Sequence, residues 1–367
     1  MNNKPFKISH SAANEYISCP QRYKYKYLEK LKPVSKNASL YFGSAIDLAI
    51  QSYLKDPKSN YEEVFTKNWK TANDLGTFIN LYDSVNIDYS YRDYDEDLLT
   101  FEDIEIAKQS QKELLPNFEG SWEEAKEYVT TRKKQRAHVH FSNNEHRYFN
   151  RLSWMSLYRK GLIMIRAFVE QVGPKIKKVL MVQKKVQLTS SAGDILTGYV
   201  DMVLDLEDHG IVIMDLKTAS MDYEQLQTLV SQQLGIYASI LGAEINSYKV
   251  GFIVLLKNLE KEKIKICKKC SFKGEGSHKT CNNEINSKRC NGEWDVKINP
   301  KGKVQILIDE LTETNMQATL DTISGVTHAI KEGLFYRNSN SCLEYGGCAF
   351  LDYCFKGDSK GIIKDEN

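Results

Sequence analysis

The chain has 367 residues, of which 41% are hydrophobic and 27% are charged, a composition typical of a folded globular protein. Its 50 basic and 48 acidic residues leave a formal charge of +2, which excludes a dedicated DNA-packaging protein but permits a local basic groove for phosphates. No segment has the length and apolarity of a membrane span or a signal peptide. We therefore expect a cytoplasmic protein without membrane contact.

Helix signals begin close to the N-terminus. Residues 9–31 predict two short helices, because the Cys19-Pro20 pair interrupts the first and proline is favoured at the start of the second. Residues 40–54 place apolar side chains at helical spacing and predict a longer helix.

The next region, residues 55–175, is expected to be mainly helical. A polar loop rich in tyrosine and aspartate is expected near 82–97, and a long amphipathic helix over 150–172. The basic segment 131–140 is interpreted as a solvated helix face or loop, with contact to a DNA backbone as the alternative.

Strand signals replace helix signals near residue 176. Three runs rich in β-branched residues, separated by turn-forming residues, predict a meander over 175–188, 194–207 and 210–217. A helix is expected over 223–241 and another strand over 246–258. A last strand near 293–298 and a helix from about 304 to 332 complete the prediction.

Two carboxylates and a lysine give the sharpest chemical signal. Asp201 ends one predicted strand, and Asp215 and Lys217 lie on the next, where alternate residues point to the same face. Carboxylate oxygens bind Mg²⁺ or Mn²⁺, which polarise a phosphodiester and lower the pKa of a bound water. The lysine can orient that water and stabilise the developing charge. The set predicts phosphodiester hydrolysis.

Alone, this pattern is short and frequent, so strand-end aspartates and a solvent-exposed lysine are the structural alternative. The neighbouring sequence adds Gly-x-x-Asp at 198–201, Asp-x-Lys-Thr at 215–218 and Gln-x-x-x-Tyr at 233–237, although an ordinary amphipathic helix also explains the last run. Together these motifs resemble the RecB-like nucleases of the PD-(D/E)xK superfamily. Residues 9–28 form a serine-initiated helix followed by Cys-Pro and an aromatic, basic helix, and this segment and residues 42–50 are similar to further motifs of that family.

The resemblance covers residues 8–50 and about 178–355. It implies an α/β fold with a restriction-endonuclease-like core, in which a central mixed sheet is flanked by helices. The resemblance assigns metal binding to Asp47, Asp201, Asp215 and the carbonyl of Leu216. It assigns positioning of the nucleophile to Lys217, and lining of the site to Gln233 and Tyr237.

Two positions depart from the family pattern. Asp47 stands where the family usually carries a metal-binding histidine, although a carboxylate can still bind a hard cation. Gln183 stands where the family often has a glutamate on the strand before the catalytic pair. The departure at Asp47 is the main support for a second hypothesis, in which the chain is a catalytically weak or inactive DNA-binding or scaffolding protein that retains the nuclease fold. The intact set of Asp201, Asp215 and Lys217 argues against it.

Four cysteines lie at the two ends of the chain: Cys19 near the start, and Cys342, Cys348 and Cys354 near the end. Structural disulfides are rare in reducing compartments, so metal ligation is the favoured interpretation. The one-plus-three arrangement resembles the iron–sulfur members of the family, including AddB-type nucleases and CRISPR-associated exonucleases. It implies a [4Fe–4S] cluster that clasps the chain ends, with zinc in the same thiolates as the alternative.

The other four cysteines are Cys267, Cys270, Cys281 and Cys290, within a short loop dense in Lys, Gly and Asn. Such a loop has little apolar material with which to fold, and four thiolates at this spacing suit a tetrahedral structural Zn²⁺. His278 is a reserve ligand. The lysines and arginine of this loop are expected either to touch DNA or a partner, or to form a solvated zinc-ribbon surface.

These signals divide the chain into five parts. They are the N-terminal family motifs with the first cluster cysteine (1–54), a helical insertion region (55–175), the nuclease core (176–266), a four-cysteine, zinc-ribbon-like insertion (267–292), and a C-terminal strand, helix and iron–sulfur cysteine triplet (293–367).

The leading hypothesis is a Mg²⁺- or Mn²⁺-dependent deoxyribonuclease, either an exonuclease or an end-processing enzyme of DNA repair, recombination or replication. Its expected partner is single-stranded DNA or DNA ends. A helicase or recombination partner is compatible with this role, since the sequence contains no Gly-x-x-x-x-Gly-Lys-[Ser/Thr] loop of its own. A redox protein is the weakest hypothesis, because a cluster held by both chain ends resembles a staple.

Overall fold

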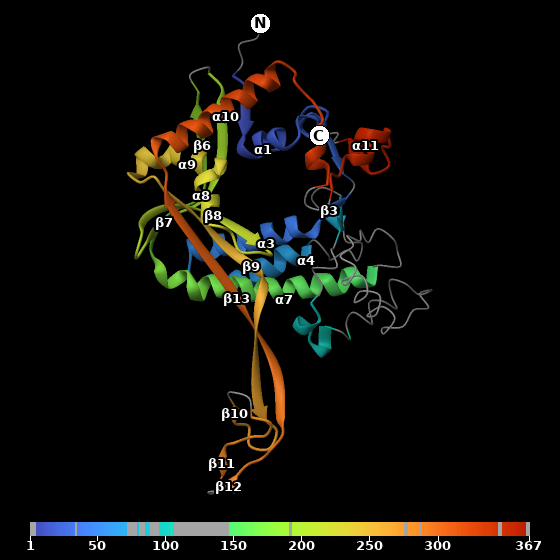
Figure 1. Ribbon diagram of the computed structural model, residues 1–367, viewed down its shortest axis with the longest axis vertical. Helices are drawn as coiled ribbons and strands as arrows, with labels where there is room; N and C mark the ends of the chain where they lie inside the picture. Colours follow the sequence, from blue (N-terminus) through green and yellow to red (C-terminus); the bar gives the residue numbers. More distant parts are fainter. Residues whose placement is uncertain are drawn as a thin grey trace.

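A mixed β-sheet with helices on both faces forms the body of the computed structural model, and a long two-stranded arm projects from it (Figure 1). The structure describes residues 5–33, 35–71, 79–80, 85–88, 95–103, 105, 147–190, 193–274, 278–285, 288–343 and 347–364. The basic segment 131–140 lies outside these residues.

The main sheet has both parallel and antiparallel strand pairs. Its strands are β1 (Lys7–Ser9), β6 (Ile176–Thr189), β7 (Ile195–Leu206), β8 (Gly210–Ala219), β9 (Lys249–Cys267), β10 (Lys273–Gly274) and β13 (Trp294–Glu310). β6, β7 and β8 form the antiparallel meander that the sequence predicts. β9 follows a helical crossover and lies parallel to β8, as such a connection permits. β13 then returns antiparallel to β9, and β1 pairs in parallel with β7. The expected central mixed sheet is confirmed.

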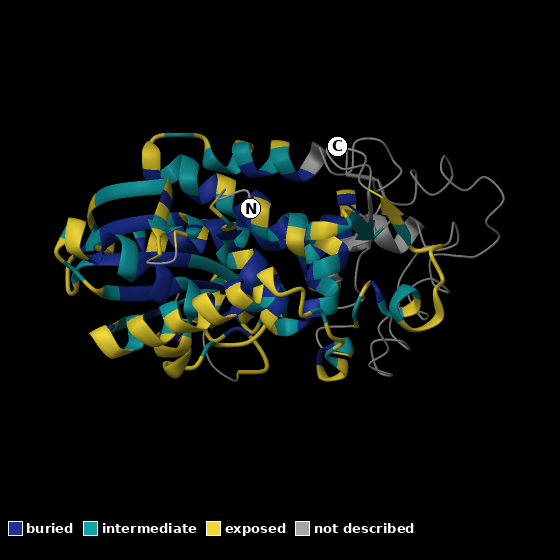
Figure 2. Cartoon of the chain, turned by 90° about the horizontal axis from the view of Figure 1, so that it is seen from above, coloured by how far each residue is buried: buried dark blue, intermediate teal, exposed yellow. Residues whose placement is uncertain are grey.

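Two hydrophobic cores lie on opposite faces of this sheet, as the buried strands between the helices show in Figure 2. The helices that cover the first face are α3 (Ala38–Lys55), α4 (Tyr61–Thr71) and α7 (Arg147–Gln171), and those that cover the second are α1 (His10–Ser18), α9 (Gln232–Ile245) and α10 (Glu313–Lys331). Because side chains alternate along a strand, β9 contributes Ile253 and Leu255 to the first core and Phe252 and Val254 to the second. A strand buried on both faces explains the continuous apolar run over 250–256.

Two predicted boundaries in the second half are wrong. The helix expected from about 304 begins only at Glu313, because residues 304–310 extend β13 and pair with β9. Thr312 starts the helix by accepting a hydrogen bond from the backbone N–H of Asn315, whose side chain in turn bonds to the backbone N–H of Thr312. The helix expected over 223–241 is divided into α8 (Leu226–Val230) and α9, since the extended backbone at Ser231 caps the second helix.

Segments near the two ends of the chain pair with one another, in the part of the molecule where Figure 1 shows α11. The elements of this region are α2 (Pro20–Tyr23), a π-helix (Lys24–Leu28), β2 (Leu31–Pro33), a 3₁₀ turn (Ser339–Cys342), α11 (Leu351–Lys356) and β14 (Ile362–Lys364). The second N-terminal helix begins at Pro20, as predicted, and β2 pairs antiparallel with β14. Segments more than 300 residues apart in sequence are thus joined by backbone hydrogen bonds.

A small three-stranded sheet lies beside α3 and comprises β3 (Ser35–Asn37), β4 (Ile79–Asn80) and β5 (Val85–Asp88). The prediction of a polar loop near 82–97 is wrong at Val85–Asp88, because these residues form β5, which pairs with both β3 and β4. Short 3₁₀ turns follow at Glu96–Leu98 and Gly173–Lys175.

The arm is the distal part of β9 and β13, and it ends in a compact module that holds β10 and a small hairpin of β11 (Glu284–Ile285) and β12 (Lys288–Arg289) (Figure 1). At its root, Lys261 pairs with Asp95 and Asp97, and Gln171 of α7 donates to the carbonyl of Gly302 at 2.9 Å. Within the described ranges, no helix combines the length and apolarity needed to cross a membrane.

Candidate active site and cysteine clusters

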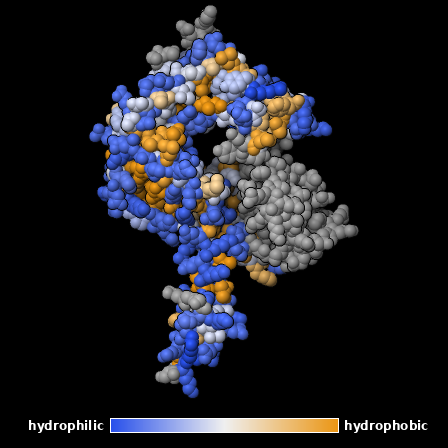
Figure 3. All heavy atoms as spheres, in the orientation of Figure 1, coloured by the Kyte–Doolittle hydropathy of each residue, from blue (hydrophilic) through white to orange (hydrophobic). Residues whose placement is uncertain are grey.

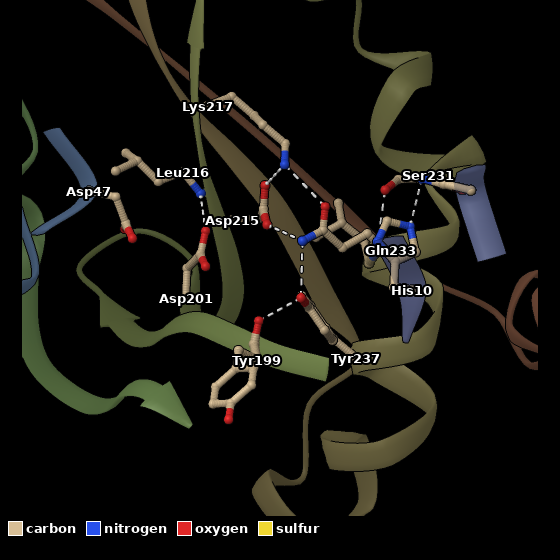
Figure 4. Close-up of polar contacts among 12 residues, drawn as sticks. His10, Asp47, Tyr199, Asp201, Asp215, Leu216, Lys217, Ser231, Gln233 and Tyr237 are labelled. Carbon is tan, nitrogen blue, oxygen red and sulfur yellow. Dashed lines mark hydrogen bonds and ion pairs between the residues drawn. The ribbon is translucent and has the colours of Figure 1, made fainter. Parts of the chain in front are cut away.

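Asp215 and Lys217 lie on β8 and point to the face that α9 covers (Figure 4). The Lys217 ammonium is 2.5 Å from Asp215 Oδ2, and the carboxylate is only 1% exposed. Gln233 from the first turn of α9 closes this group, because its Nε2 donates to Asp215 Oδ1 at 2.6 Å and its Oε1 accepts from Lys217 at 3.1 Å. Three of the residues singled out by the sequence therefore form one polar cluster.

Tyr237 lies one turn further along α9 and ties the helix to β7. Its hydroxyl accepts a hydrogen bond from Gln233 at 3.0 Å and donates to the backbone carbonyl of Tyr199 at 2.6 Å. The ring lies so close to Gly198 that a Cβ at that position would be 3.0 Å from it. The glycine of the Gly-x-x-Asp motif is therefore explained by this close approach rather than by a turn.

Asp201 and Asp47 come from different elements and lie beside one another. Asp201 Oδ2 accepts from the backbone N–H of Leu216 at 3.0 Å, which joins β7 to β8 next to Asp215. Asp47, on α3, accepts from Gln51 at 2.6 Å. The amide of Gln183 bridges the two acids, at 3.1 Å from Asp201 Oδ1 and 3.5 Å from Asp47 Oδ2.

Gln183 occupies an unusual backbone conformation on β6. Its φ of 51° lies in the left-handed region, which costs a non-glycine residue roughly 1–2 kcal/mol. In the strand register it falls opposite Asp201, between the pairs Val182–Met202 and Lys184–Val200. The strained backbone thus aims a neutral amide at two carboxylates. Backbone strain of this kind is often found at functional sites.

Burial and mutual repulsion shift the protonation of these acids. Burial raises the pKa of Asp215 to about 7, and the neighbouring Asp201 adds to this, while Lys217 opposes it. Burial and Asp201 likewise raise the pKa of Asp47 to about 6. The pKa of Lys217 is raised, since its ion pair with Asp215 outweighs the cost of burial. The lysine stays cationic at neutral pH, whereas Asp47 and Asp215 lose their protons only as the pH rises through about 6 and about 7.

The donor set fits a divalent cation. Asp47 Oδ1 and Asp215 Oδ2 are buried and accept no hydrogen bond, although Asp215 Oδ2 has its ion pair with Lys217. Buried acceptors without a donor are costly unless another positive group satisfies them. The ligand atoms that Asp47, Asp201 and Asp215 offer are all carboxylate oxygens, which suit a hard cation that keeps several water ligands, as Mg²⁺ does.

His10, the first residue of α1, was not singled out by the sequence. Burial and the charge of Lys217 lower the pKa of its imidazole to about 4, so the ring is neutral and lies near the polar cluster. Figure 4 shows it beside Ser231, at the start of α9. The pairing of β1 with β7 and the packing of α1 against α9 bring this histidine to the site, and no local pattern marks it.

The insertion cysteines form a compact four-sulfur group, Cys267, Cys270, Cys281 and Cys290, whose Sγ atoms all lie within 4.8 Å of one another. The Cys267–Cys290 and Cys270–Cys281 sulfurs are 3.7 and 3.6 Å apart. Four sulfurs at about 2.3 Å from one tetrahedral ion would be about 3.8 Å apart, so the group fits a single metal ion. His278 is not a member of this group; its carbonyl accepts from Trp294 at 3.0 Å.

Hydrogen bonds hold the C-terminal segment against α1. Asn338 Nδ2 and the Ser341 hydroxyl both donate to the carbonyl of Ser18 at 2.8 Å, and the hydroxyl of Tyr16 donates to the carbonyl of Leu334 at 2.5 Å. These contacts place the residue after Ser18, the first of the terminal cysteines, beside the C-terminal triplet.

The terminal cysteines approach one another but are spaced more widely. Burial, together with the thiols of Cys348, Cys19 and Cys354, raises the pKa of Cys342, so the four lie within electrostatic range. No three of them form a compact group in the described part of the chain, as the insertion cysteines do. The Arg22 guanidinium lies within electrostatic range of the Cys348 thiol and supplies a positive charge beside the set.

Comparison with known proteins gives one family. Residues 7–355, almost the whole chain, match the family model described as the PD-(D/E)XK nuclease superfamily. No curated protein matches the chain.

Proposed function

We propose a function for this chain from its family, since it belongs to the PD-(D/E)XK nuclease superfamily. It is a Mg²⁺- or Mn²⁺-dependent deoxyribonuclease that processes DNA ends in repair, recombination or replication. The observation that carries this proposal is the buried pair of Asp215 and Lys217, with Asp201 and Asp47 beside it and two carboxylate oxygens that accept no hydrogen bond.

Asp201, Asp215 and Asp47 would hold the metal ion, with the Leu216 carbonyl as a further oxygen ligand. An ion bound there polarises the scissile phosphate and lowers the pKa of a bound water. Lys217 is the only cation among the residues of the polar cluster described above. Because its pKa is raised, it acts as a hydrogen-bond donor to the attacking water and the phosphate oxygens rather than as a base.

Gln233 and Tyr237 position the reacting groups. The Gln233 amide contacts both Asp215 and Lys217, so it fixes the separation of the two charges. Tyr237 holds Gln233 in turn and links it to β7. Their roles in lining the site are therefore supported by a continuous chain of hydrogen bonds from α9 to the catalytic strands.

We further propose that Cys19, Cys342, Cys348 and Cys354 hold a [4Fe–4S] cluster and that the insertion cysteines hold Zn²⁺. In a four-iron cluster each thiolate binds a different iron, so the sulfurs are further apart than around one ion. The wider spacing of the terminal set supports a cluster, and the compact insertion set supports a single zinc ion. The cluster would clasp the two chain ends.

The test is digestion of end-labelled single- and double-stranded DNA by protein purified without oxygen, with Mg²⁺ or Mn²⁺ added. Asp215→Asn and Lys217→Met run beside the wild type, and the iron and zinc contents and the visible absorbance are recorded on the same sample. We expect metal-dependent cleavage that both variants lose. Folded, cluster-loaded protein that binds DNA but cleaves none would instead support the non-catalytic DNA-binding hypothesis.

A further inference from the structure

The zinc arm, defined here as residues 261–302, carries the chain's excess positive charge. It contains 11 lysines and arginines against 5 aspartates and glutamates, a difference of +6, whereas the whole chain has a formal charge of +2. The remainder of the chain is therefore at −4. A Zn²⁺ ion with four thiolates contributes −2, so the loaded arm still has a charge of +4. Charge is thus separated between the body and the arm.

Several cations at the tip of the arm have no acidic partner among the residues that the structure describes. Lys268 pairs with Glu293 and Lys301 with Glu262, so part of the charge is neutralised internally. Other tip cations are exposed and have no ion pair with any described carboxylate. They are Lys269, Lys273, Lys279, Lys288 and Arg289. Figure 3 shows that the visible face of this tip is predominantly hydrophilic.

The module that presents these cations is built around its metal site. Its core consists of the cysteines and Trp294, and Gly274 packs directly against the indole ring. The indole Nε1 is fixed by the carbonyl of His278, which also accepts from Lys265. The metal and one tryptophan therefore fix where the basic side chains point, although the module has almost no apolar core.

The arm is also a direct extension of the strand beside the active site. Lys217 and Ala219 on β8 pair in register with Val254 and Leu256 on β9, and β9 continues from there to Cys267 at the tip. These eleven further residues span at most roughly 36 Å at about 3.3 Å per residue. That reach is close to one turn of B-DNA.

We propose that the tip of the zinc arm binds the phosphate backbone of the DNA substrate within about one helical turn of the cleaved bond. The proposal rests on the proposed nuclease function, because that function places DNA at β8. Unpaired lysines and an arginine suit phosphates, whereas the centre of a protein–protein interface is depleted in lysine. Phe272 and Ile285, the exposed large apolar residues described at the tip, are 39% and 42% exposed, and Val296 and Ile298, at 51% and 38%, lie on β13 away from the tip, so a protein partner is less well matched there.

The test uses the full chain, loaded with zinc and carrying Lys217→Ala so that bound DNA is not cleaved. The arm variant replaces four exposed tip cations with glutamine: Lys269, Lys273, Lys288 and Arg289. The matched control replaces four exposed lysines of the body with glutamine: Lys58, Lys175, Lys178 and Lys360. Fluorescence anisotropy measures binding to a labelled duplex of about 40 bp and to a hairpin with a stem of about 8 bp, shorter than one turn.

We expect the arm variant to bind the long duplex roughly 10- to 100-fold more weakly than the control, and to lose roughly 2 to 4 from the slope of log K against log salt. Binding to the short hairpin should be nearly unchanged, because it cannot span the site and the tip. Equal affinity and equal slope in the arm variant and the control, with equal zinc content, would overturn the proposal, and so would a loss that is as large on the short hairpin.

These outcomes are separable from failure of the nuclease function. If the protein without Lys217→Ala cleaves no DNA but the arm variant still loses salt-dependent binding, the nuclease proposal fails, and only the phosphate contact of the arm stands, without its distance from a cleaved bond. If that protein cleaves long DNA and the four arm substitutions change neither cleavage nor binding, the arm proposal alone fails.

Discussion

Gln183 donates from its side-chain amide to Asp201 at 3.1 Å, directly across the register of β6 and β7. The same amide is 3.5 Å from Asp47, so a neutral side chain separates two acids that come from different elements. A glutamate at this position would add a third negative charge beside Asp47, whose pKa is already raised by burial and by the charge of Asp201, whereas the amide adds none. Gln183 is thus a positioning residue for the proposed metal site.

We expect Gln183→Ala to reduce DNA cleavage about 10- to 100-fold and to raise the Mg²⁺ concentration needed for half-maximal rate, because Asp47 and Asp201 lose their common donor. Gln187→Ala, a substitution on the exposed part of the same strand, is the control and should retain full activity. Cleavage rates measured over a Mg²⁺ titration give both the maximal rate and the Mg²⁺ concentration for half-maximal rate of each variant. An unchanged Mg²⁺ requirement in Gln183→Ala would show that the bridge is only structural.

We expect Asp47→Asn to stabilise the protein at alkaline pH in the absence of added Mg²⁺. The pKa of Asp47 is raised to about 6 in the folded state from its ordinary value of 3.8, so the folded state binds this proton more tightly. The resulting stabilisation is complete below about pH 4 and is lost as pH rises through about 6. Asparagine removes the buried charge, so Asp47→Asn should gain about 1–3 kcal/mol at pH 8.

Urea unfolding at pH 5 and pH 8 measures this difference, with Asp208→Asn in the exposed turn after β7 as the control. The gain should be smaller at pH 5, where Asp47 is largely protonated. A destabilised Asp47→Asn at pH 8 would mean that the hydrogen bonds from Gln51 and Gln183 outweigh the cost of the charge.

We expect Lys217→Met to lower single-turnover cleavage by roughly 100- to 1,000-fold, because the positive donor beside the scissile phosphate is lost. The pKa of Asp215 should also rise above about 7, since Lys217 is the group that lowers it. Mg²⁺ activation should therefore move to higher pH. Lys249→Ala on the neighbouring strand, where the side chain bonds to the carbonyl of His209, is the control. A full rate in Lys217→Met would remove the lysine from the mechanism.

We expect Cys281→Ser to release the metal of the insertion and to unfold the tip of the arm without unfolding the body. Cys281 is fully buried in a module whose other core residues are three cysteines and Trp294. Zinc content reports loss of the metal, limited proteolysis reports unfolding of the tip, and the melting temperature reports whether the body stays folded. Thr280→Ala, at an exposed neighbouring position, should keep the zinc. Protease resistance of the metal-free tip would contradict a metal-dependent fold.

The sequence alone determined the features that depend on local spacing. Asp215 and Lys217 share a face because they are two residues apart on a strand, and the insertion cysteines meet because they lie within one short loop. Runs of β-branched residues likewise predicted the meander of β6, β7 and β8. Each of these features is set by neighbours along the chain, so pattern and spacing suffice.

Only the tertiary structure decided the features that depend on distant partners. Residues 304–310 form a strand because β9 is there to pair with them, although their pattern also allows a helix. His10 and the bridge from Gln183 reach the site through strand pairing and an uncommon backbone angle that no local motif encodes. The physical reason is that long-range backbone pairing and burial outweigh local preference wherever several conformations have similar local energies.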